Sequence, residues 1–306
     1  MKEKRCGYLI FLLVMVFAFI SHTAVAQKHA LVFQTDFGLK DGAVSAMKGV
    51  SFGVDKNLSI FDLTHEIPVF NTWEAAYRLY QTVMYWPAGT VVVSVVDPGV
   101  GTERKSVVLK TKSGHYIVTP NNGTLTLVAE HLGIDAIRQI DEKMNRLPGS
   151  ELSHTFHGRD VYAYTGARLA SGVITFAEVG PLLPMQVVSI PYQKAGFIDG
   201  KLCGTIPILD IQDGNVWTNI SNDLFQKMKL NYGDEVNVTI YHGEAVVYSG
   251  KMPFAHAFGE VTEGQPLLYL NSLLNVSVGL NQESFAGKNG INSGANWRIE
   301  LTKVNE

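Results

Sequence analysis

The stretch Val91–Arg104 reads Val-Val-Val-Ser-Val-Val-Asp-Pro-Gly-Val-Gly-Thr-Glu-Arg. A run of β-branched residues without a polar face ends in Asp97, and a glycine-rich turn and Arg104 follow. Such a run is typical of a strand that is buried on both faces, as in a parallel sheet covered by helices. Ligands of open α/β sheets bind beyond the carboxyl ends of the strands. The sequence therefore predicts that Asp97 lies at the functional edge of a sheet.

The segments around this strand alternate between strand and helix patterns. Short apolar runs predict strands at His29–Thr35, Asn57–Leu63, Lys105–Thr111 and His115–Thr119, the last two joined as a hairpin by Ser113-Gly114. Amphipathic patterns predict helices after Asp41, over Trp73–Tyr85 with Thr72 as its cap, over Thr124–His131, and up to Ser171-Gly172. This alternation predicts a layered α/β domain over residues 27–190, with a mostly parallel sheet flanked by helices.

The pattern changes near residue 190. Gly180-Pro-Leu-Leu-Pro184 and Ile190-Pro191 are typical of a linker. Short strand patterns then follow one another at Lys201–Ile211, Val216–Ile220, Glu235–Tyr241, Ala245–Tyr248, Pro266–Asn271 and Val276–Leu280. Asn222–Lys229 reads as a helix between them. The sequence predicts an all-β, barrel-like C-terminal domain over residues 191–306.

The first 26 residues have the pattern of a signal peptide. Lys2, Lys4 and Arg5 form a basic start, Tyr8–Ile20 is an uncharged apolar run, and Ala24-Val25-Ala26 offers a cleavage site. The apolar run is shorter than the roughly 20 residues of a membrane helix. We expect export to the periplasm or the cell exterior after cleavage, with no membrane attachment of the mature chain; an uncleaved anchor is the alternative.

Composition and charge exclude several classes of protein. The chain has 306 residues, of which 46% are apolar and 17% charged, so it is long enough for two hydrophobic cores. Loss of residues 1–26 would remove three basic side chains and one acidic one, which changes the net charge from −3 to −5. This balance does not indicate a nucleic-acid partner. Cys6 would leave with the signal peptide, so Cys203 would have no disulfide partner, and no His/Cys metal spacing is present.

Gly99 and Gly101 do not indicate a nucleotide-phosphate loop. Such a loop opens a helix whose N-terminus binds the phosphate. Here the glycines lead into Lys105–Thr111, which is strand-like. We expect the glycines to shape a tight turn.

Asp97, Arg104 and His157 are the candidate catalytic residues. A carboxylate paired with a guanidinium stays ionised and keeps one orientation, although a structural salt bridge in a turn would use the same pair. His157 lies in Thr155-Phe-His-Gly-Arg-Asp160, a glycine-containing segment before a helix. Alone it would be an ordinary histidine; together with Asp97 and Arg104 it could hold and deprotonate a water molecule.

Three polar residues are candidate ligand contacts. Asp36 follows the first strand and could bind a vicinal diol or merely cap a helix. Asp210 and Asn215 flank Asp213-Gly214, a turn, and could face a polar ligand or belong to a hairpin without a function.

Six motifs together resemble one family, and they cover nearly the whole mature chain in order. They are Thr35-Asp-Phe-Gly38, Asp62-Leu-Thr-His-Glu-Ile-Pro68, Val96-Asp-Pro-Gly-Val-Gly-Thr102, Thr155–Asp160, Gly214-Asn-Val-Trp-Thr-Asn-Ile220 and Asn271-Ser272. The family is that of the S-adenosyl-L-methionine hydroxide adenosyltransferases, related to the fluorinating and chlorinating enzymes that use the same substrate. The resemblance implies an α/β domain followed by a β-barrel domain. It also implies a homotrimer with its sites between the N-terminal domain of one subunit and the C-terminal domain of the next.

The resemblance further implies the reaction and the roles of the residues. Water, positioned and activated by Asp97, Arg104 and His157, would attack the 5′ carbon of the ribose and release adenosine and L-methionine, without a cofactor or metal. The remaining roles follow in the same way: Asp36 would bind the ribose hydroxyls, Phe70 would pack near the ribose and adenine, Asp210 would pair with the substrate ammonium, Ser272 would bind its carboxylate, and Asn215 and Phe254 would contact adenine.

The halogenating relatives differ at informative positions. They have a tyrosine where this chain has Asp97, and the fluorinating branch has a serine at the position of Gly158. A carboxylate repels a halide and attracts a water proton, so Asp97 favours hydrolysis. An exported nucleoside-binding protein of the same fold, with little or no turnover, is the alternative, and the complete set of Asp97, Arg104 and His157 favours the enzyme.

Overall fold

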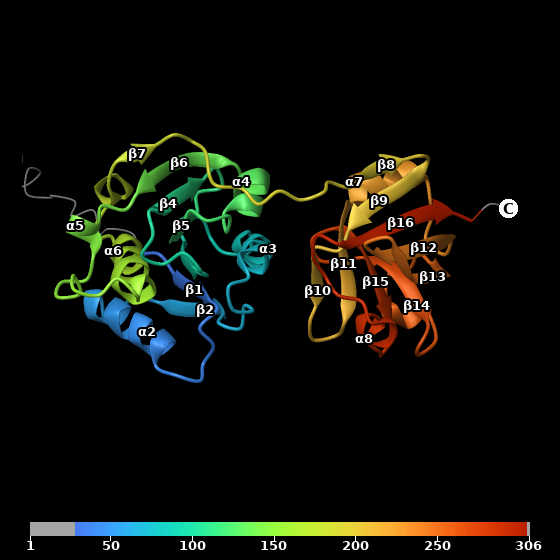
Figure 1. The fold of residues 1–306 in the computed structure, drawn as a ribbon, viewed down its shortest axis with the longest axis horizontal. Helices are drawn as coiled ribbons and strands as arrows, with labels where there is room; N and C mark the ends of the chain where they lie inside the picture. The colour runs from blue at the N-terminus through green and yellow to red at the C-terminus, as the bar shows by residue number, and fades with distance from the viewer. Residues whose placement is uncertain (1–27, 305–306) are drawn as a thin grey trace, which may run out of the picture.

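The computed structural model describes residues 28–304, in two regions that are joined by one crossing of the chain (Figure 1). The predicted signal peptide lies outside the described residues. Within residues 28–304, none of the helices is both long enough and apolar enough to cross a membrane.

The N-terminal region is built on one seven-stranded sheet, whose strands lie in the order β2-β1-β3-β5-β4-β6-β7. The strands are β1 Leu31–Thr35, β2 Ile60–Thr64, β3 Val91–Val95, β4 Ser106–Thr111, β5 Tyr116–Pro120, β6 Ile134–Gln139 and β7 Leu182–Leu183. β1 pairs in parallel with β2 and β3, and β3 pairs in parallel with β5. The remaining pairs are antiparallel. The α/β prediction is confirmed, but the sheet is mixed rather than mostly parallel, because a hairpin as short as β4–β5 can join only antiparallel strands.

Helices cover both faces of this sheet, as the run before Asp97 predicts (Figure 1). They are α2 Ala43–Val54, α3 Thr72–Val83, α4 Thr126–Leu132, α5 Glu142–Asn145, a π-helical turn η1 Gly158–Ala163, α6 Tyr164–Ala170 and a 3₁₀ turn η2 Phe176–Val179. Val91 and Val93 pack on the side of α2 and α6, whereas Val92 packs on the side of α3 and α4. Asn71, and not the predicted Thr72, caps α3 by accepting a hydrogen bond from the backbone N–H of Glu74.

One glycine fixes how closely a helix approaches the central strand. A Cβ atom on Gly166 would lie 2.4 Å from Cγ2 of Val93. The absence of a side chain at this position in α6 therefore lets the helix lie directly on β3. The strand β3, which leads to Asp97, is fully covered as a result, and none of its five residues is exposed.

The C-terminal region consists of two antiparallel sheets that enclose one apolar core, which confirms its predicted all-β character. One sheet has the order β10-β11-β15-β14 and the other β13-β12-β16-β9-β8. The strands are β8 Gly196–Ile198, β9 Lys201–Thr205, β10 Ile208–Asp210, β11 Asn215–Ser221, β12 Glu235–His242, β13 Ala245–Pro253, β14 Pro266–Leu270, β15 Asn275–Leu280 and β16 Trp297–Lys303. Short helices are α7 Asn222–Phe225, η3 Gln226–Met228, η4 Phe258–Glu260 and α8 Phe285–Asn289. The sequence did not predict β16, which pairs with both β12 and β9.

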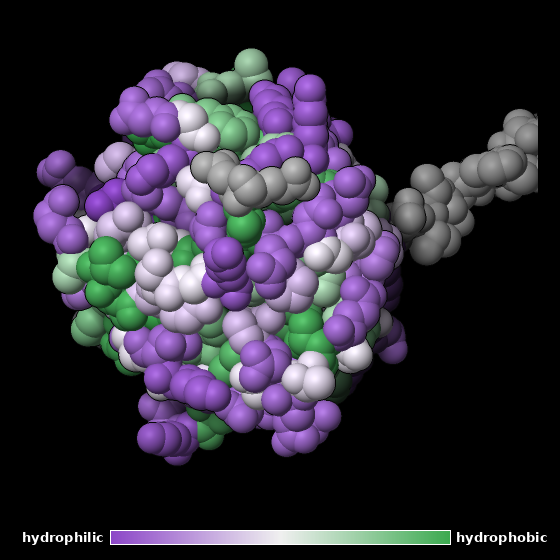
Figure 2. Space-filling model, turned by 90° about the vertical axis from the view of Figure 1, so that its right-hand side faces the viewer, coloured by the Kyte–Doolittle hydropathy of each residue, from purple (hydrophilic) through white to green (hydrophobic). Residues whose placement is uncertain are grey.

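The two regions contact each other through α3 and the start of the second region. The indole N–H of Trp73 donates to the carbonyl oxygen of Pro207 at 2.9 Å, and Arg78 donates to that of Leu209 at 3.0 Å. Tyr77 and Trp217 belong to one apolar cluster at the same contact. Seen from the C-terminal end, apolar residues form separate small patches among polar ones (Figure 2).

Candidate active site

Asp97 and Arg104 form a two-point ion pair directly beyond the end of β3. Nε of Arg104 donates to Oδ1 of Asp97 at 2.8 Å, and Nη2 contacts Oδ2. The two side chains are 5% and 11% exposed, respectively. Two backbone hydrogen bonds close the turn between them: the N–H of Val100 donates to the carbonyl oxygen of Asp97, and the N–H of Thr102 donates to that of Gly99. Gly101 in this turn has a φ of +80°. The glycines therefore shape the turn, as predicted.

His157 completes the predicted group of three residues. It precedes the π-helical turn η1, and 6% of its surface is exposed. Its Nδ1 atom lies 3.2 Å from Nη2 of Arg104, and its Nε2 atom lies 2.9 Å from Nη2 of Arg146. The fold thus brings Asp97, Arg104 and His157 together, and it adds Arg146, which the sequence did not indicate.

The surroundings of the ion pair favour a charged Arg104 and a neutral His157. Burial opposes the charge of Arg104, but the hydrogen bond to Asp97 and the nearby Tyr162, Asp97 and Glu142 together outweigh it and raise the pKa of the guanidinium. Burial lowers the pKa of His157, and the nearby Arg104 and Arg146 lower it further against the opposing effects of Glu142 and Asp97. At neutral pH the group therefore combines one ion pair with an uncharged imidazole.

A cavity of about 180 Å³ opens beside these side chains. Its lining comes from the ends of β1 and β3, the loop before α3 and the segment before η1: Asp36, Phe37, Val69, Phe70, Val95, Asp97, Val100, Thr155, Phe156, His157 and Gly158. All of these residues belong to the N-terminal region. The cavity lies where an α/β sheet places its ligands, at the carboxyl ends of parallel strands.

Asp36 and Phe70 meet at the rim of this cavity. Oδ2 of Asp36 accepts a hydrogen bond from the backbone N–H of Phe70 at 2.9 Å, and burial raises the pKa of the carboxyl group. Asp36 does not cap α2, which is preceded by Gly42. Phe70 has a φ of +69° and is 67% exposed, so its ring is open to solvent.

Asp210 and Asn215 lie on a different surface, in the hairpin of β10 and β11. The Asn215 amide donates to Oδ2 of Asp210 at 3.1 Å. Asn215, Asp213 and Phe258 line a cavity of about 470 Å³, all of whose lining residues belong to the C-terminal region. A Cβ atom on Gly279 would lie 2.5 Å from Oδ1 of Asn215 and 2.7 Å from the Phe258 ring, so this glycine leaves room between them.

Ser272 and Phe254 have opposite environments. Ser272 is exposed in the turn between β14 and β15, and its carbonyl oxygen accepts a hydrogen bond from the hydroxyl group of Tyr85 at 3.3 Å. Phe254 is 1% exposed and packs in the apolar core between the rings of Phe225 and Tyr232. The adenine contact predicted for Phe254 is therefore wrong, because the ring has no free face. Phe258 is the aromatic residue that lines the cavity with Asn215.

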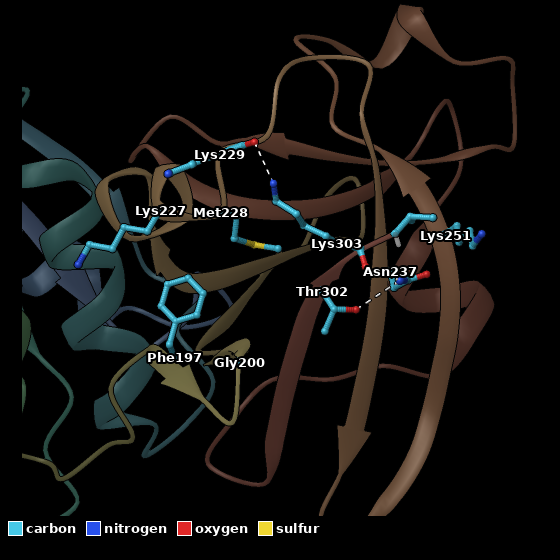
Figure 3. A pocket seen from close by; sticks show the side chains of 10 residues that line it. Phe197, Gly200, Lys227, Met228, Lys229, Asn237, Lys251, Thr302 and Lys303 are labelled. Carbon is cyan, nitrogen blue, oxygen red and sulfur yellow. Dashed lines mark hydrogen bonds between the residues drawn. The ribbon is translucent and has the colours of Figure 1, made fainter. Parts of the chain in front are cut away.

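A larger cavity, of about 750 Å³, lies elsewhere in the C-terminal region. Four lysines line it, and Figure 3 shows that Lys227 and Lys251 point away from one another. Lys303 donates to the carbonyl oxygen of Lys229 at 3.3 Å. Its ammonium groups do not converge, and its lining residues include no carboxylate or histidine. The cavity beside Asp97, in contrast, is lined by the carboxylates of Asp36 and Asp97 and by His157.

The sequence did not indicate two residues that the structure places at these sites. Arg146 lies in a polar segment, Asp141–Ser150, with no motif that links it to His157. Phe258 lies four residues after Phe254, within Ala257-Phe-Gly-Glu260, so a second aromatic residue close by is the sequence feature that points to it. In residues 28–304, no group of three or more His, Cys, Asp and Glu side chains is arranged to bind a metal ion.

Comparison with known proteins gives matches along nearly the whole described chain. The family model of the SAM hydroxide adenosyltransferase N-terminal domain matches residues 31–180, and that of the C-terminal domain matches residues 204–298. The (R)-S-adenosyl-L-methionine hydrolase of Methanocaldococcus jannaschii is 38% identical over 75% of this chain and 80% of its own. A fluorinase of Actinopolyspora mzabensis is 25% identical over 88% of this chain and 96% of its own. The crystal structure of an uncharacterized conserved protein from Thermotoga maritima covers 89% of this chain and 100% of its own, with a TM-score of 0.81 and 34% identity.

Proposed function

The chain belongs to the SAM hydroxide adenosyltransferase family, and on this premise we propose that it hydrolyses S-adenosyl-L-methionine to adenosine and L-methionine. Relatives named as hydrolases match it at 30–38% identity over most of its length, and a fluorinase at 25%. The observation that carries the reaction type is the ion pair of Asp97 and Arg104 beside His157, at the edge of a cavity.

The reaction needs a positioned water molecule more than it needs an activated leaving group. The oxygen of water forms the new bond to the 5′ carbon of the ribose, and the C5′–S bond breaks with its electron pair going to sulfur. The sulfonium thereby leaves as a neutral thioether, and one proton is released. Asp97, fixed by Arg104, accepts a hydrogen bond from the water, and His157 completes the group that positions it. In-line placement and partial removal of bulk water are the effects that such a site supplies.

The N-terminal half of the site binds the nucleoside in this proposal. Asp36 keeps one oxygen on the backbone of Phe70 and uses the other for the ribose hydroxyls. Phe70 packs against the ribose and adenine with its exposed ring. The reaction uses no metal or other cofactor, because the substrate already contains its leaving group.

The C-terminal half of the site binds the rest of the substrate. Asp210 pairs with the substrate ammonium, Ser272 binds the carboxylate, and Asn215 contacts adenine. Phe258 replaces Phe254 as the aromatic contact of adenine, since it lines the cavity beside Asn215. Phe258 is the one aromatic ring among the residues lining that cavity.

The protein works as a homotrimer in this proposal, with each site shared by two subunits. Two observations support it. The cavity beside Asp97 is lined by the N-terminal region, and the cavity beside Asn215 by the C-terminal region. Val69 and Phe70 at the first cavity are 64% and 67% exposed, which leaves apolar surface for a neighbouring subunit to cover.

Export is part of the proposal and rests on the pattern of residues 1–26. Cleavage after Ala26 would release a chain that begins at Gln27. Mass spectrometry of the N-terminus of protein recovered from the producing cells tests this cleavage, and an intact Met1 would contradict it.

The test of the reaction is incubation of the purified protein with S-adenosyl-L-methionine, followed by chromatography. We expect equimolar adenosine and L-methionine, with and without EDTA, and incorporation of ¹⁸O from labelled water into the 5′ hydroxyl of adenosine. Failure to form either product, together with tight adenosine binding in calorimetry, would identify a nucleoside-binding protein instead.

A further inference from the structure

His157 lies between two arginines, and this limits where its proton can be. Arg104 faces Nδ1 at 3.2 Å and Arg146 faces Nε2 at 2.9 Å. A guanidinium group has donors and no acceptor, whereas a neutral imidazole has one N–H group and one acceptor nitrogen. Only one ring nitrogen of His157 can therefore accept a hydrogen bond from its arginine.

The contact with Arg146 is the better hydrogen bond. It is the shorter of the two, and 2.9 Å is the usual donor–acceptor separation. Arg104 already donates through Nε and Nη2 to Asp97 and through Nη1 to Ser106. We propose that Arg146 is a positioning residue: by donating to Nε2 it fixes His157 in the tautomer whose proton is on Nδ1, on the side of Asp97 and Arg104.

Arg146 itself is held on several sides. Its side chain is 6% exposed, and its Nη2 atom lies 2.9 Å from a carboxylate oxygen of Glu142. Nη1 donates to the carbonyl oxygens of Ser150 and Ser153 at 3.4 and 3.2 Å. The backbone N–H of Leu147 donates to the carbonyl oxygen of Asp160 in η1 at 2.8 Å, which ties the end of α5 to the turn that follows His157. The guanidinium is therefore preorganised and needs no rearrangement to meet the ring.

The fixed tautomer assigns different tasks to His157 and Asp97. With Nε2 occupied, His157 presents an N–H donor toward the ion pair, and the Asp97 carboxylate remains the acceptor for the water proton. A charged imidazole would place a third cation between Arg104 and Arg146, with Glu142 and Asp97 as the facing anions and the exposed His154 ring 6.2 Å away. Burial and the two arginines lower the pKa of His157, which agrees with a neutral ring.

The decisive experiment is long-range ¹H–¹⁵N NMR of the histidine rings in the full chain, without substrate. His157→Gln identifies the His157 signals by their loss. We expect Nδ1 to be protonated and Nε2 to be unprotonated in the wild type at neutral pH. In Arg146→Met we expect a mixture of tautomers and a pKa of His157 that is higher than in the wild type, because a positive charge has been removed.

Kinetics supply the second readout, which rests on the proposed function, whereas the NMR readout does not require turnover. We expect Arg146→Met to lower kcat by about 10–100-fold with KM changed less than about twofold, since small misplacements of catalytic groups have effects of this size. Arg146→Lys, which retains a charged donor, should recover part of kcat and most of the Nδ1–H tautomer.

Arg168→Met is the matched control. Arg168 donates to the carbonyl oxygen of Met144 at 2.6 Å and to the Asn145 side chain at 2.7 Å, so it supports the same segment without contacting His157. It should cost stability and leave the His157 tautomer unchanged. A wild-type ring protonated on Nε2 would overturn the proposal, and this measurement decides even if Arg146→Met fails to fold. A folded Arg146→Met variant with the same tautomer balance as Arg168→Met would overturn it as well.

Discussion

At the scale of single residues, Asp97 has the environment of a group that must stay charged. Arg104 binds both of its oxygens, and 5% of its side chain is exposed. We expect Asp97→Asn to lower kcat by at least about 100-fold, because acid–base groups contribute factors of this order. Calorimetry with adenosine should show a binding constant within about threefold of the wild type, because the variant leaves the proposed nucleoside contacts at Asp36 and Phe70 intact. Unchanged kcat in Asp97→Asn would remove this carboxylate from the mechanism.

The pH dependence of the enzyme follows from His157. Burial lowers its pKa from 6.5, and Arg104 and Arg146 act in the same direction. A group with a lowered pKa stays neutral above that pKa and gains its proton only as the pH falls below it. We therefore expect kcat/KM to be constant from pH 8 down to about 6.5 and to fall only at lower pH. If kcat/KM fell to half of its maximum at the same pH in the wild type and in Arg146→Met, and that pH were above 6.5, this assignment would be contradicted.

At the scale of elements, the π-helical turn η1 places His157 and Gly158 against the end of β1. A Cβ atom on Gly158 would lie 3.0 Å from the ring of Phe37, which packs edge-on against Phe156. We expect Gly158→Ser to push the Phe37 ring into the 180 Å³ cavity and to lower kcat/KM for hydrolysis by about 10-fold, at a stability cost of about 1 kcal/mol. Halide should yield no 5′-halogenated nucleoside, because Asp97 still repels the anion.

Gly49→Ser is the control for this substitution. Gly49 is exposed in α2, and a Cβ atom there would have no neighbour within 4 Å. Its kcat/KM should equal that of the wild type. Chromatography of the products and thermal unfolding of both variants provide the comparison, and a Gly158→Ser enzyme as active as Gly49→Ser would show that Phe37 has room to move elsewhere.

The elements also show which contacts a sequence can predict. Asp97 and Arg104 are seven positions apart in one turn, so their pairing was open to local reasoning. His157 is 53 positions from Arg104, and no local pattern links the two residues; the sequence groups them by their chemistry and by the family resemblance. Arg146 meets His157 because the backbone N–H of Leu147 donates to the carbonyl oxygen of Asp160 in η1, a tertiary contact without a local pattern. Phe254 and Phe258 have similar sequence surroundings, and only the packing of the core distinguishes the buried ring from the one at a cavity.

At the scale of the molecule, the two halves of the proposed site belong to different regions of the chain. α3 joins the regions through Trp73 and Arg78, which donate to the backbone at Pro207 and Leu209. This contact holds the hairpin of Asp210 and Asn215 in a defined position beside α3. The cavity at Asp97 and the cavity at Asn215 nevertheless have no lining residue in common. A head-to-tail ring of subunits would bring one half of each site to its complement on the next subunit.

Subunit mixing tests this arrangement directly. Asp97→Asn disables the N-terminal half of a site, and Asp210→Ala disables the C-terminal half, so each homotrimer should be nearly inactive. In mixed trimers formed by co-expression, about a quarter of the sites should combine two intact halves, since each shared site draws its halves independently from two subunits. We expect adenosine formation to recover to about a quarter of the wild-type rate per subunit. If each site were built within one chain, every site would keep one defect, and the mixture would be no more active than the two parents.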